Sequence, residues 1–359
     1  MSPYPEPLVS VLTPVYNGED FLAECIESVL GQTFTNFEYL IINNCSTDRS
    51  LEIALSYAKK DNRIRVHRND SFVGVIENHN IAFSLISPMA RYCKVVSADD
   101  LIFRECLSRM VEVAEANPSV GIVGSYQLAG SGDVNWQGFQ YPRSVLPGPE
   151  ICRRIFLEGH PGFGFGTPTS ILYRADLVRS GRAFYPNSSP HADTSACFDC
   201  LRHSDFGFAY QVLSYQRIHR ETQSSRSAQI NRYASAYLSD LIHYGPSYLS
   251  EDELQQLLKK RLGDYHRFLA VNLIPFRGKD FWNYHKTRLA ELGYPLTPAT
   301  MLKAAAITLL REIGNPEQAL RRLWKHIVPN SRGAIVRTAP PSPAAAGNVS
   351  ESRTAASKP

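Results

Sequence analysis

The stretch from Leu8 to Asn17, LVSVLTPVYN, begins as an apolar strand and breaks into a polar turn at Pro14. Apolar residues then recur at helical spacing between residues 19 and 30. A second apolar stretch, FEYLII at residues 37–42, ends in the polar run NNCSTD. The sequence therefore starts with a strand, a helix and a second strand, and each strand is followed by polar residues.

This alternation continues over about the first 120 residues. We expect helices at residues 49–59, 76–86 and 106–116, and strands at residues 64–67, 92–96 and 120–123. Strands that alternate with helices favour a mostly parallel, Rossmann-like sheet with helices on both faces. In such α/β sheets, ligands bind beyond the carboxyl ends of the strands. The polar runs after the strands, residues 13–17, 43–48 and 97–100, are therefore expected to meet in one crevice.

One of these strand ends, CKVVSADD at residues 93–100, carries two adjacent carboxylates, Asp99 and Asp100. An unpaired buried carboxylate is costly, so packing alone does not explain the pair. A hard divalent cation prefers oxygen ligands and bridges phosphates, so the pair could hold such an ion beside a nucleotide diphosphate. A solvated turn or the start of a helix would give the same two residues.

Six motifs, taken in order, resemble glycosyltransferase family 2. These enzymes have the GT-A fold and transfer a sugar from a nucleotide-sugar donor. The motifs are TPVYNGEDFLAECIESVLGQT (13–33), FEYLIINNCSTD (37–48), SADD (97–100), GTPTSILYR (166–174), HAD (191–193) and YQRIH (215–219). The resemblance covers roughly residues 8–225.

The resemblance implies a donor site made from three strand ends. Its expected residues are Thr13, Pro14, Val15, Tyr16, Asn43, Asn44, Ser97 and Asp100. The family commonly has acidic residues at the two asparagine positions, and an amide offers uracil a different set of donors and acceptors. Residues 46–48 are expected to cap the following helix instead.

The same resemblance implies a bound Mn²⁺ or Mg²⁺. Asp99 would be its ligand, with diphosphate oxygens and waters completing the shell. The ion would neutralise charge on the departing nucleotide diphosphate. Asp100 would contact the ribose or donor sugar, or support the site from behind. His219 could also reach the metal, and Arg217 could bind phosphate or form an ion pair within the domain.

Asp193 is the expected catalytic base, since it stands where the family carries its base carboxylate. Inverting transfer needs a group that removes the acceptor hydroxyl's proton as that oxygen attacks. The alternative is that Asp193 caps a helix expected at residues 196–201. Phe163 and Phe165, in a glycine-rich segment, are expected to wall the acceptor side, although buried core positions would also explain them.

Composition and charge place further limits on the chain. Seven scattered cysteines favour a reduced, cytoplasmic setting, and no apolar run of membrane-spanning length occurs. The expected organisation is a GT-A catalytic domain at 1–225, a C-terminal helical extension at 226–329 and a disordered tail at 330–359. The basic segment around Arg321, Arg322 and Lys325 could lie on an anionic membrane or pack as a solvated helix. No interleaved basic and aromatic surface suggests nucleic acid.

Three functions compete at this point. The first is an inverting, metal-dependent glycosyltransferase that acts on a glycan or lipid-linked glycan in surface polysaccharide biosynthesis. The second is a catalytically degenerate module that binds nucleotide sugar or glycan, suggested by Asn43, Asn44 and Ser97. The third is a nucleotidyltransferase, which would need a glycine-rich basic loop directly after the first strand, where TPVYN stands instead.

Overall fold

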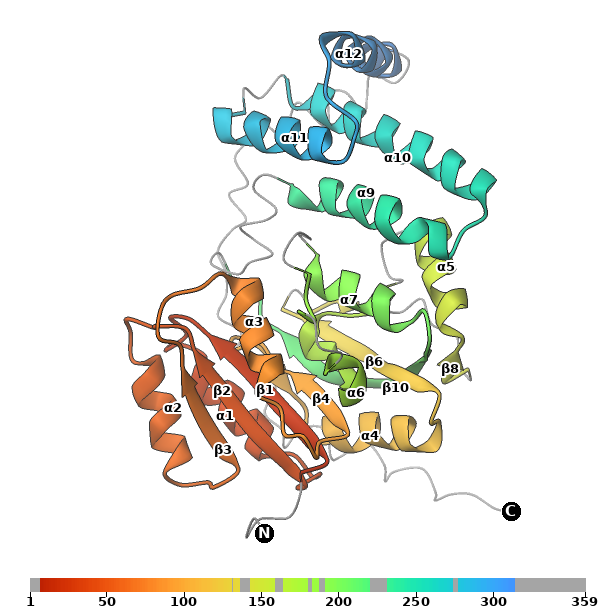
Figure 1. Ribbon diagram of the computed structural model, residues 1–359. Coiled ribbons are helices and arrows are strands. Elements are labelled where there is room, and N and C mark those ends of the chain that lie inside the picture. Colours follow the sequence, from red (N-terminus) through yellow and green to blue (C-terminus); the bar gives the residue numbers. More distant parts are fainter. Residues whose placement is uncertain are drawn as a thin grey trace, which may run out of the picture.

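The computed structural model describes residues 7–130, 132–135, 143–158, 164–179, 183–186, 191–219, 231–273 and 277–313. These residues form one mixed sheet with helices on both faces, and the C-terminal helices are stacked beyond one face (Figure 1). The strands are β1 (Val9–Val15), β2 (Phe37–Asn43), β3 (Ile64–Arg68), β4 (Tyr92–Val95), β5 (Leu101–Ile102), β6 (Val120–Ala129), β7 (Val134–Asn135), β8 (Val145–Leu146), β9 (Ile171–Arg174) and β10 (Asp205–Gln216).

The helices follow the expected order. They are α1 (Leu22–Leu30), α2 (Ser50–Ala58), α3 (Val75–Ser84), α4 (Cys106–Ala116), α5 (Gly148–Glu158), α6 (Ala175–Val178), α7 (Ala192–Cys200), α9 (Arg232–Tyr244), α10 (Glu251–Val271), α11 (Lys279–Glu291) and α12 (Pro298–Ile313). Of two short 3₁₀ turns, η1 (Pro168–Ser170) leads directly into β9, and η2 (Gly245–Ser247) joins α9 to α10.

The sheet is mostly parallel, as the sequence predicts, but an antiparallel strand divides it. The order is β3-β2-β1-β4-β9-β6-β10-β5. Strands β1 to β4 run parallel and β6 runs parallel to β10, whereas β9 pairs antiparallel with both β4 and β6. Because β9 runs antiparallel, η1 at its start lies at the same edge of the sheet as the carboxyl end of β4. The motif GTPTSILYR therefore reaches the expected crevice from the opposite chain direction.

Each face of the sheet has its own apolar core. In β2, Leu40 and Ile42 face the core under α3, α5 and α7, whereas Tyr39 and Ile41 face the core under α1 and α4. This alternation follows from the two-residue period of a strand. Because both faces are covered, the strands are apolar almost throughout, and polar side chains collect at their ends.

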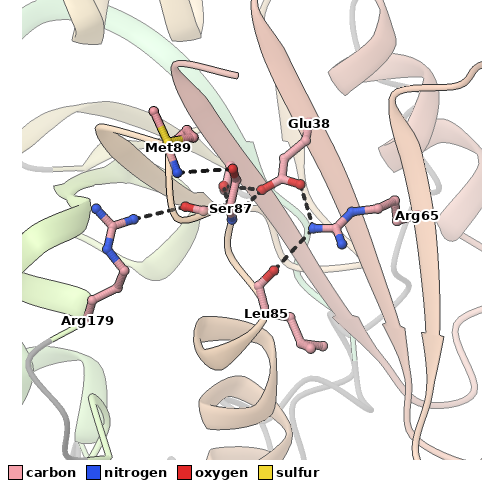
Figure 2. A network of polar contacts seen from close by, with 7 residues as sticks. Glu38, Arg65, Leu85, Ser87, Met89 and Arg179 are labelled. Carbon is pink, nitrogen blue, oxygen red and sulfur yellow. Dashed lines mark hydrogen bonds and ion pairs between the residues drawn. The ribbon is translucent and has the colours of Figure 1, made fainter. Parts of the chain in front are cut away.

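A polar network closes the amino ends of the strands (Figure 2). Glu38 of β2 accepts hydrogen bonds from Ser10 Oγ at 2.5 Å, from the Ser87 backbone N–H at 2.6 Å and from Arg65 Nη2 at 2.6 Å. Arg179 donates to the Ser87 carbonyl at 2.9 Å. These contacts fix the connection from α3 to β4 at the edge opposite the carboxyl ends.

The C-terminal helices pack partly on the main α/β fold and partly on each other. Leu241 and Tyr244 of α9 belong to the core of the α7 face, while Tyr265, Phe281 and Leu289 build a separate small core. The domain boundary expected at residue 225 and the tail at 330–359 fall outside the described residues. Among the described helices, none is long and apolar enough to cross a membrane.

Candidate active site

The carboxyl end of β4 and the residues after β10 meet at one point. Asp99 Oδ2 lies 3.1 Å from His219 Nε2, and both side chains are partly exposed. The backbone between Ser97 and Asp100 forms a turn in which the Asp100 N–H donates to the Ser97 carbonyl at 2.9 Å. The structure therefore joins two motifs, SADD and YQRIH, that are far apart in the sequence.

Arg217 secures this junction from several directions. Its backbone N–H donates to Asp100 Oδ1 at 3.1 Å, and its Nε donates to the Asp99 carbonyl at 2.9 Å. Its Nη2 pairs with Glu24 at 2.7 Å, and its guanidinium lies over the ring of Phe21. Of the two roles expected for Arg217, the structure shows the ion pair within the domain, and the Nε hydrogen bond of the same side chain holds the Asp99 backbone in place.

Asp100 lies behind the crevice rather than in it. The residue is only 4% exposed, and its Oδ2 accepts a hydrogen bond from Thr169 Oγ1 at 2.6 Å. Burial, followed by the neighbouring charge of Asp99, raises its pKa to about 7. Since its other oxygen accepts the N–H of Arg217, the supporting role fits its surroundings, and direct contact with ribose or sugar does not.

A buried lysine, which the sequence analysis overlooked, lies beneath the same turn. Lys94 in β4 is fully buried, and its Nζ donates to the carbonyls of Thr169 and Ile171, the latter at 3.1 Å. Burial lowers its pKa. Thr169 also accepts a hydrogen bond from the Ser97 N–H at 3.1 Å. A lysine inside the apolar run CKVV was the signal that a polar partner must lie opposite.

The residues at the carboxyl end of β1 and just beyond it divide between core and crevice. Thr13 is fully buried, and its hydroxyl shares a hydrogen bond with Tyr39 Oη and donates to the Val96 carbonyl, each at 2.9 Å. Val15 is buried as well. Because side chains alternate along a strand, these two face the α1 core and are not placed to touch a donor. Pro14 is partly exposed and Tyr16 is exposed.

The two asparagines at the carboxyl end of β2 also differ. Asn44 Nδ2 donates to the Val73 carbonyl at 2.8 Å, and its Oδ1 accepts from the Val73 N–H and from Asn69, each at 3.0 Å. Asn44 therefore braces the loop before α3 instead of facing a base. Asn43 is buried too, but its Oδ1 has no hydrogen-bond partner within the described part of the chain.

The run from Ser46 to Asp48 mainly ties two loops together. Ser46 Oγ accepts the N–H of Asn17 at 3.1 Å, and the Thr47 N–H donates to Asn17 Oδ1 at 2.8 Å. Asp48 accepts the N–H of Ser50, in the first turn of α2, at 3.0 Å. Only Asp48 therefore contacts the helix that all three were expected to cap.

Asp193 lies in the first turn of α7, which begins at Ala192 rather than at residue 196. His191 holds the N-cap position and Asp193 is the second residue of the helix, so Asp193 is not the cap of this helix. Asp193 is partly exposed, and its charge opposes the lowering of the His79 pKa that burial causes. The His79 ring stacks on Tyr185 at 5.5 Å. Asp193 therefore lies near His79, in the middle of α3.

Phe163 and Phe165 were expected to wall the acceptor side, and the structure does not support this role for Phe165. Phe165 is 4% exposed and packs edge-to-face against Phe198 with ring centroids 4.9 Å apart. Phe165 is thus a core residue, as the alternative interpretation held. Phe163 lies outside the described residues.

The donor set at Asp99 and His219 suits a divalent cation with few protein ligands. Adjacent ligands of an octahedral ion with bonds near 2.1 Å are about 3 Å apart, which matches the 3.1 Å separation of their two atoms. In the described part of the chain, no group of three or more His, Cys, Asp or Glu side chains could hold a metal. Further ligands would therefore come from phosphate and water.

Comparison with known proteins identifies the chain's relatives. The profile described as "Glycosyl transferase family 2" matches residues 10–181. The glycosyltransferase EpsJ of Bacillus subtilis, described as uncharacterized, is 40% identical over 119 residues, which cover 33% of each chain. GlyG of Streptococcus pneumoniae is 29% identical over 129 residues, covering 36% of this chain and 42% of the relative. The chain thus spans well under two thirds of these relatives.

Solved structures share the fold over a longer span. Staphylococcus aureus TarS 1–349 in complex with UDP-GlcNAc matches with a TM-score of 0.56 and 17% identity, covering 79% of this chain and 80% of that one. The complex of the same protein with UDP matches with a TM-score of 0.57 and 15% identity, covering 86% and 92%. Residues 10–181, just under half of the chain, therefore match glycosyltransferase family 2, and the fold is the GT-A fold.

Proposed function

We propose that the protein transfers a sugar, with inversion, from a nucleotide-diphosphate sugar to a hydroxyl of a glycan or lipid-linked glycan. The observation that carries the proposal is the pair Asp99 and His219 at the carboxyl edge of the sheet. This is the edge at which α/β sheets bind ligands. The TarS complexes with UDP-GlcNAc and UDP support a uridine nucleotide as the donor's carrier.

Asp99 and His219 would hold Mn²⁺ or Mg²⁺, and a nitrogen ligand beside a carboxylate suits Mn²⁺. The bound ion supplies Lewis-acid stabilisation of the leaving diphosphate. Arg217 holds the backbone of Asp99, and Thr169 holds Asp100 behind it, so the ligand is fixed before the donor arrives. On the nucleotide side, Tyr16 and Asn43 remain the proposed contacts.

Asp193 would accept the proton of the attacking acceptor hydroxyl. Its place in the first turn of a helix, partly exposed, gives the carboxylate a fixed backbone and access to substrate. A base held on a helix is positioned better than one on a loop, which matters because small displacements cost large factors in rate.

We propose a role in surface polysaccharide biosynthesis. We also propose that the acceptor is presented at an anionic membrane surface, on its cytoplasmic side. The support for the membrane contact is α12, which exposes Leu302, Leu309 and Leu310. Residues 301–359 hold nine Lys and Arg against three Asp and Glu, which complements anionic lipid. Flotation with vesicles containing phosphatidylserine tests this contact: Leu302→Glu with Leu309→Glu should abolish binding, and equal binding would contradict it.

A degenerate binding module is the second candidate. It is favoured by one observation, that Asn44 braces a loop and presents no charge to the donor. Both candidates predict nucleotide binding, so turnover separates them.

A donor panel of UDP- and GDP-sugars with Mn²⁺ provides the test. Wild type should hydrolyse or transfer at least one donor, and Asp99→Asn and Asp193→Asn should each lose at least a hundredfold in kcat/KM. Asp199→Asn, at the other end of α7, serves as the matched control. No turnover by wild type, or full activity of either site variant, would refute the proposed reaction.

A further inference from the structure

The first turn of α7 is held by a residue of the C-terminal helices. Asp240 of α9 is 3% exposed, and its Oδ1 accepts a hydrogen bond from Ser195 Oγ at 2.9 Å. Its Oδ2 lies 3.9 Å from His191 Nδ1. His191 and Ser195 stand two residues before and two residues after Asp193, so one carboxylate contacts both flanks of the proposed base.

This carboxylate is in a costly environment. Burial raises the pKa of Asp240 to about 7, and the charge of Asp193 adds to the increase. Within the described residues, its Oδ2 is buried without a hydrogen-bond donor. The positive charge of Arg288 in α11 opposes this increase in the pKa. Buried carboxylates in such surroundings destabilise a fold, and proteins retain them mainly at functional sites.

We infer that Asp240 is a positioning residue that sets the first turn of α7, and hence Asp193, for sugar transfer. The inference rests on the proposed function, because it needs Asp193 to be the base. Its consequence is that α9, which follows the segment matched by the family profile, completes the active site. The helical extension is then part of the catalytic machinery.

The hydrogen bond and the charge of Asp240 can be removed separately. Ser195→Ala deletes the hydroxyl that bonds to Oδ1 and keeps the carboxylate. Asp240→Asn keeps an acceptor for Ser195 but replaces the oxygen that faces His191 and that is charged above pH 7, so the variants are compared at pH 8. Asp199→Asn is the matched control, since Asp199 lies farther along α7 and accepts a hydrogen bond from Tyr244 of α9 at 3.3 Å.

The experiment measures kcat, donor KM, melting temperature and hydrogen exchange of the full chain. For Asp240→Asn and Ser195→Ala, we expect kcat to fall at least tenfold while the donor KM stays within twofold. Exchange of the amides of residues 193–196 should quicken in Ser195→Ala. The melting temperature of Asp240→Asn should not fall, so lost folding cannot explain lost rate. The control should match wild type in every measurement.

Two kinds of failure are distinguishable. If wild type turns over donor and Asp193→Asn does not, yet Asp240→Asn and Ser195→Ala keep the wild-type kcat, the positioning role is wrong and the proposed function stands. If kcat and melting temperature fall together in both variants, the positioning role is also wrong, because such a result would indicate a purely structural contact. If wild type has no turnover, or Asp193→Asn is fully active, the proposed function itself fails.

Discussion

Replacing Asp240 with Asn should stabilise the protein above pH 7 and change its stability little near pH 4. The reason is the raised pKa of Asp240 in the folded state, about 7 against an ordinary value of 3.8. Between these values the folded protein keeps a proton that the unfolded chain releases. Stability therefore falls as pH rises from about 4 to 7, and the loss is complete above pH 7.

The size of the effect follows from the shift. One pKa unit corresponds to about 1.4 kcal/mol, so a shift from 3.8 to about 7 corresponds to roughly 4 kcal/mol at pH 8. Asparagine has no charge to desolvate and can still accept from Ser195, so most of this cost should disappear in the variant. The expected gain is therefore about 2–4 kcal/mol at pH 8 and close to zero at pH 4.

Urea denaturation of wild type and Asp240→Asn at pH 4, 5, 6, 7 and 8 measures this difference. The comparison must be between the two proteins, because Asp100, whose pKa is also raised to about 7, titrates in both. The gap between their unfolding free energies should open between pH 4 and 7 and then stay constant. A constant gap across the whole range, or a variant less stable at pH 8, would refute the reasoning.

Three further substitutions test the supports of the site. Thr169→Val removes the hydroxyl that donates to buried Asp100 and should cost about 1.5–3 kcal/mol of unfolding free energy, measured by urea denaturation; an unchanged value would contradict it. Asn44 accepts a hydrogen bond from the Val73 N–H, so Asn44→Ala should speed hydrogen exchange of that amide; protection equal to wild type would argue against the bracing role of Asn44. Gly166→Ala should lower the melting temperature, because φ there is +132° and an added Cβ would meet a side-chain oxygen at 2.4 Å; an unaltered melt would show that the strain is relieved.

Apart from the two-residue strand β5, the order of elements up to β6 could be predicted from sequence because each longer helix and strand there has a clear period. Residues 37–42 and 106–116, for example, were placed almost to the residue. The antiparallel insertion of β9 could not be predicted. Its apolar residues, Ile171, Leu172 and Tyr173, fit a strand of either direction, and only the pairing with β4 and β6 reveals that η1 lies at the carboxyl edge.

The site was predictable in its parts and not in its layout. The period of a strand implies that Thr13 and Val15 share a face, but which face borders the crevice depends on where α1 packs. The distant partners Thr169 and Arg217 meet Asp100 only through tertiary pairing. Asp240 gave no local signal at all, because a lone acid in an amphipathic helix usually faces solvent.

The most direct test is calorimetric titration of UDP and GDP into the wild type, Asp99→Asn and His219→Ala, each with and without Mn²⁺. If Asp99 and His219 hold the cation that carries the diphosphate, the wild type should bind one nucleotide at least tenfold more tightly with Mn²⁺. Both variants should lose that gain while keeping the wild-type melting temperature. Undiminished, Mn²⁺-dependent binding in Asp99→Asn would contradict the assignment of this site.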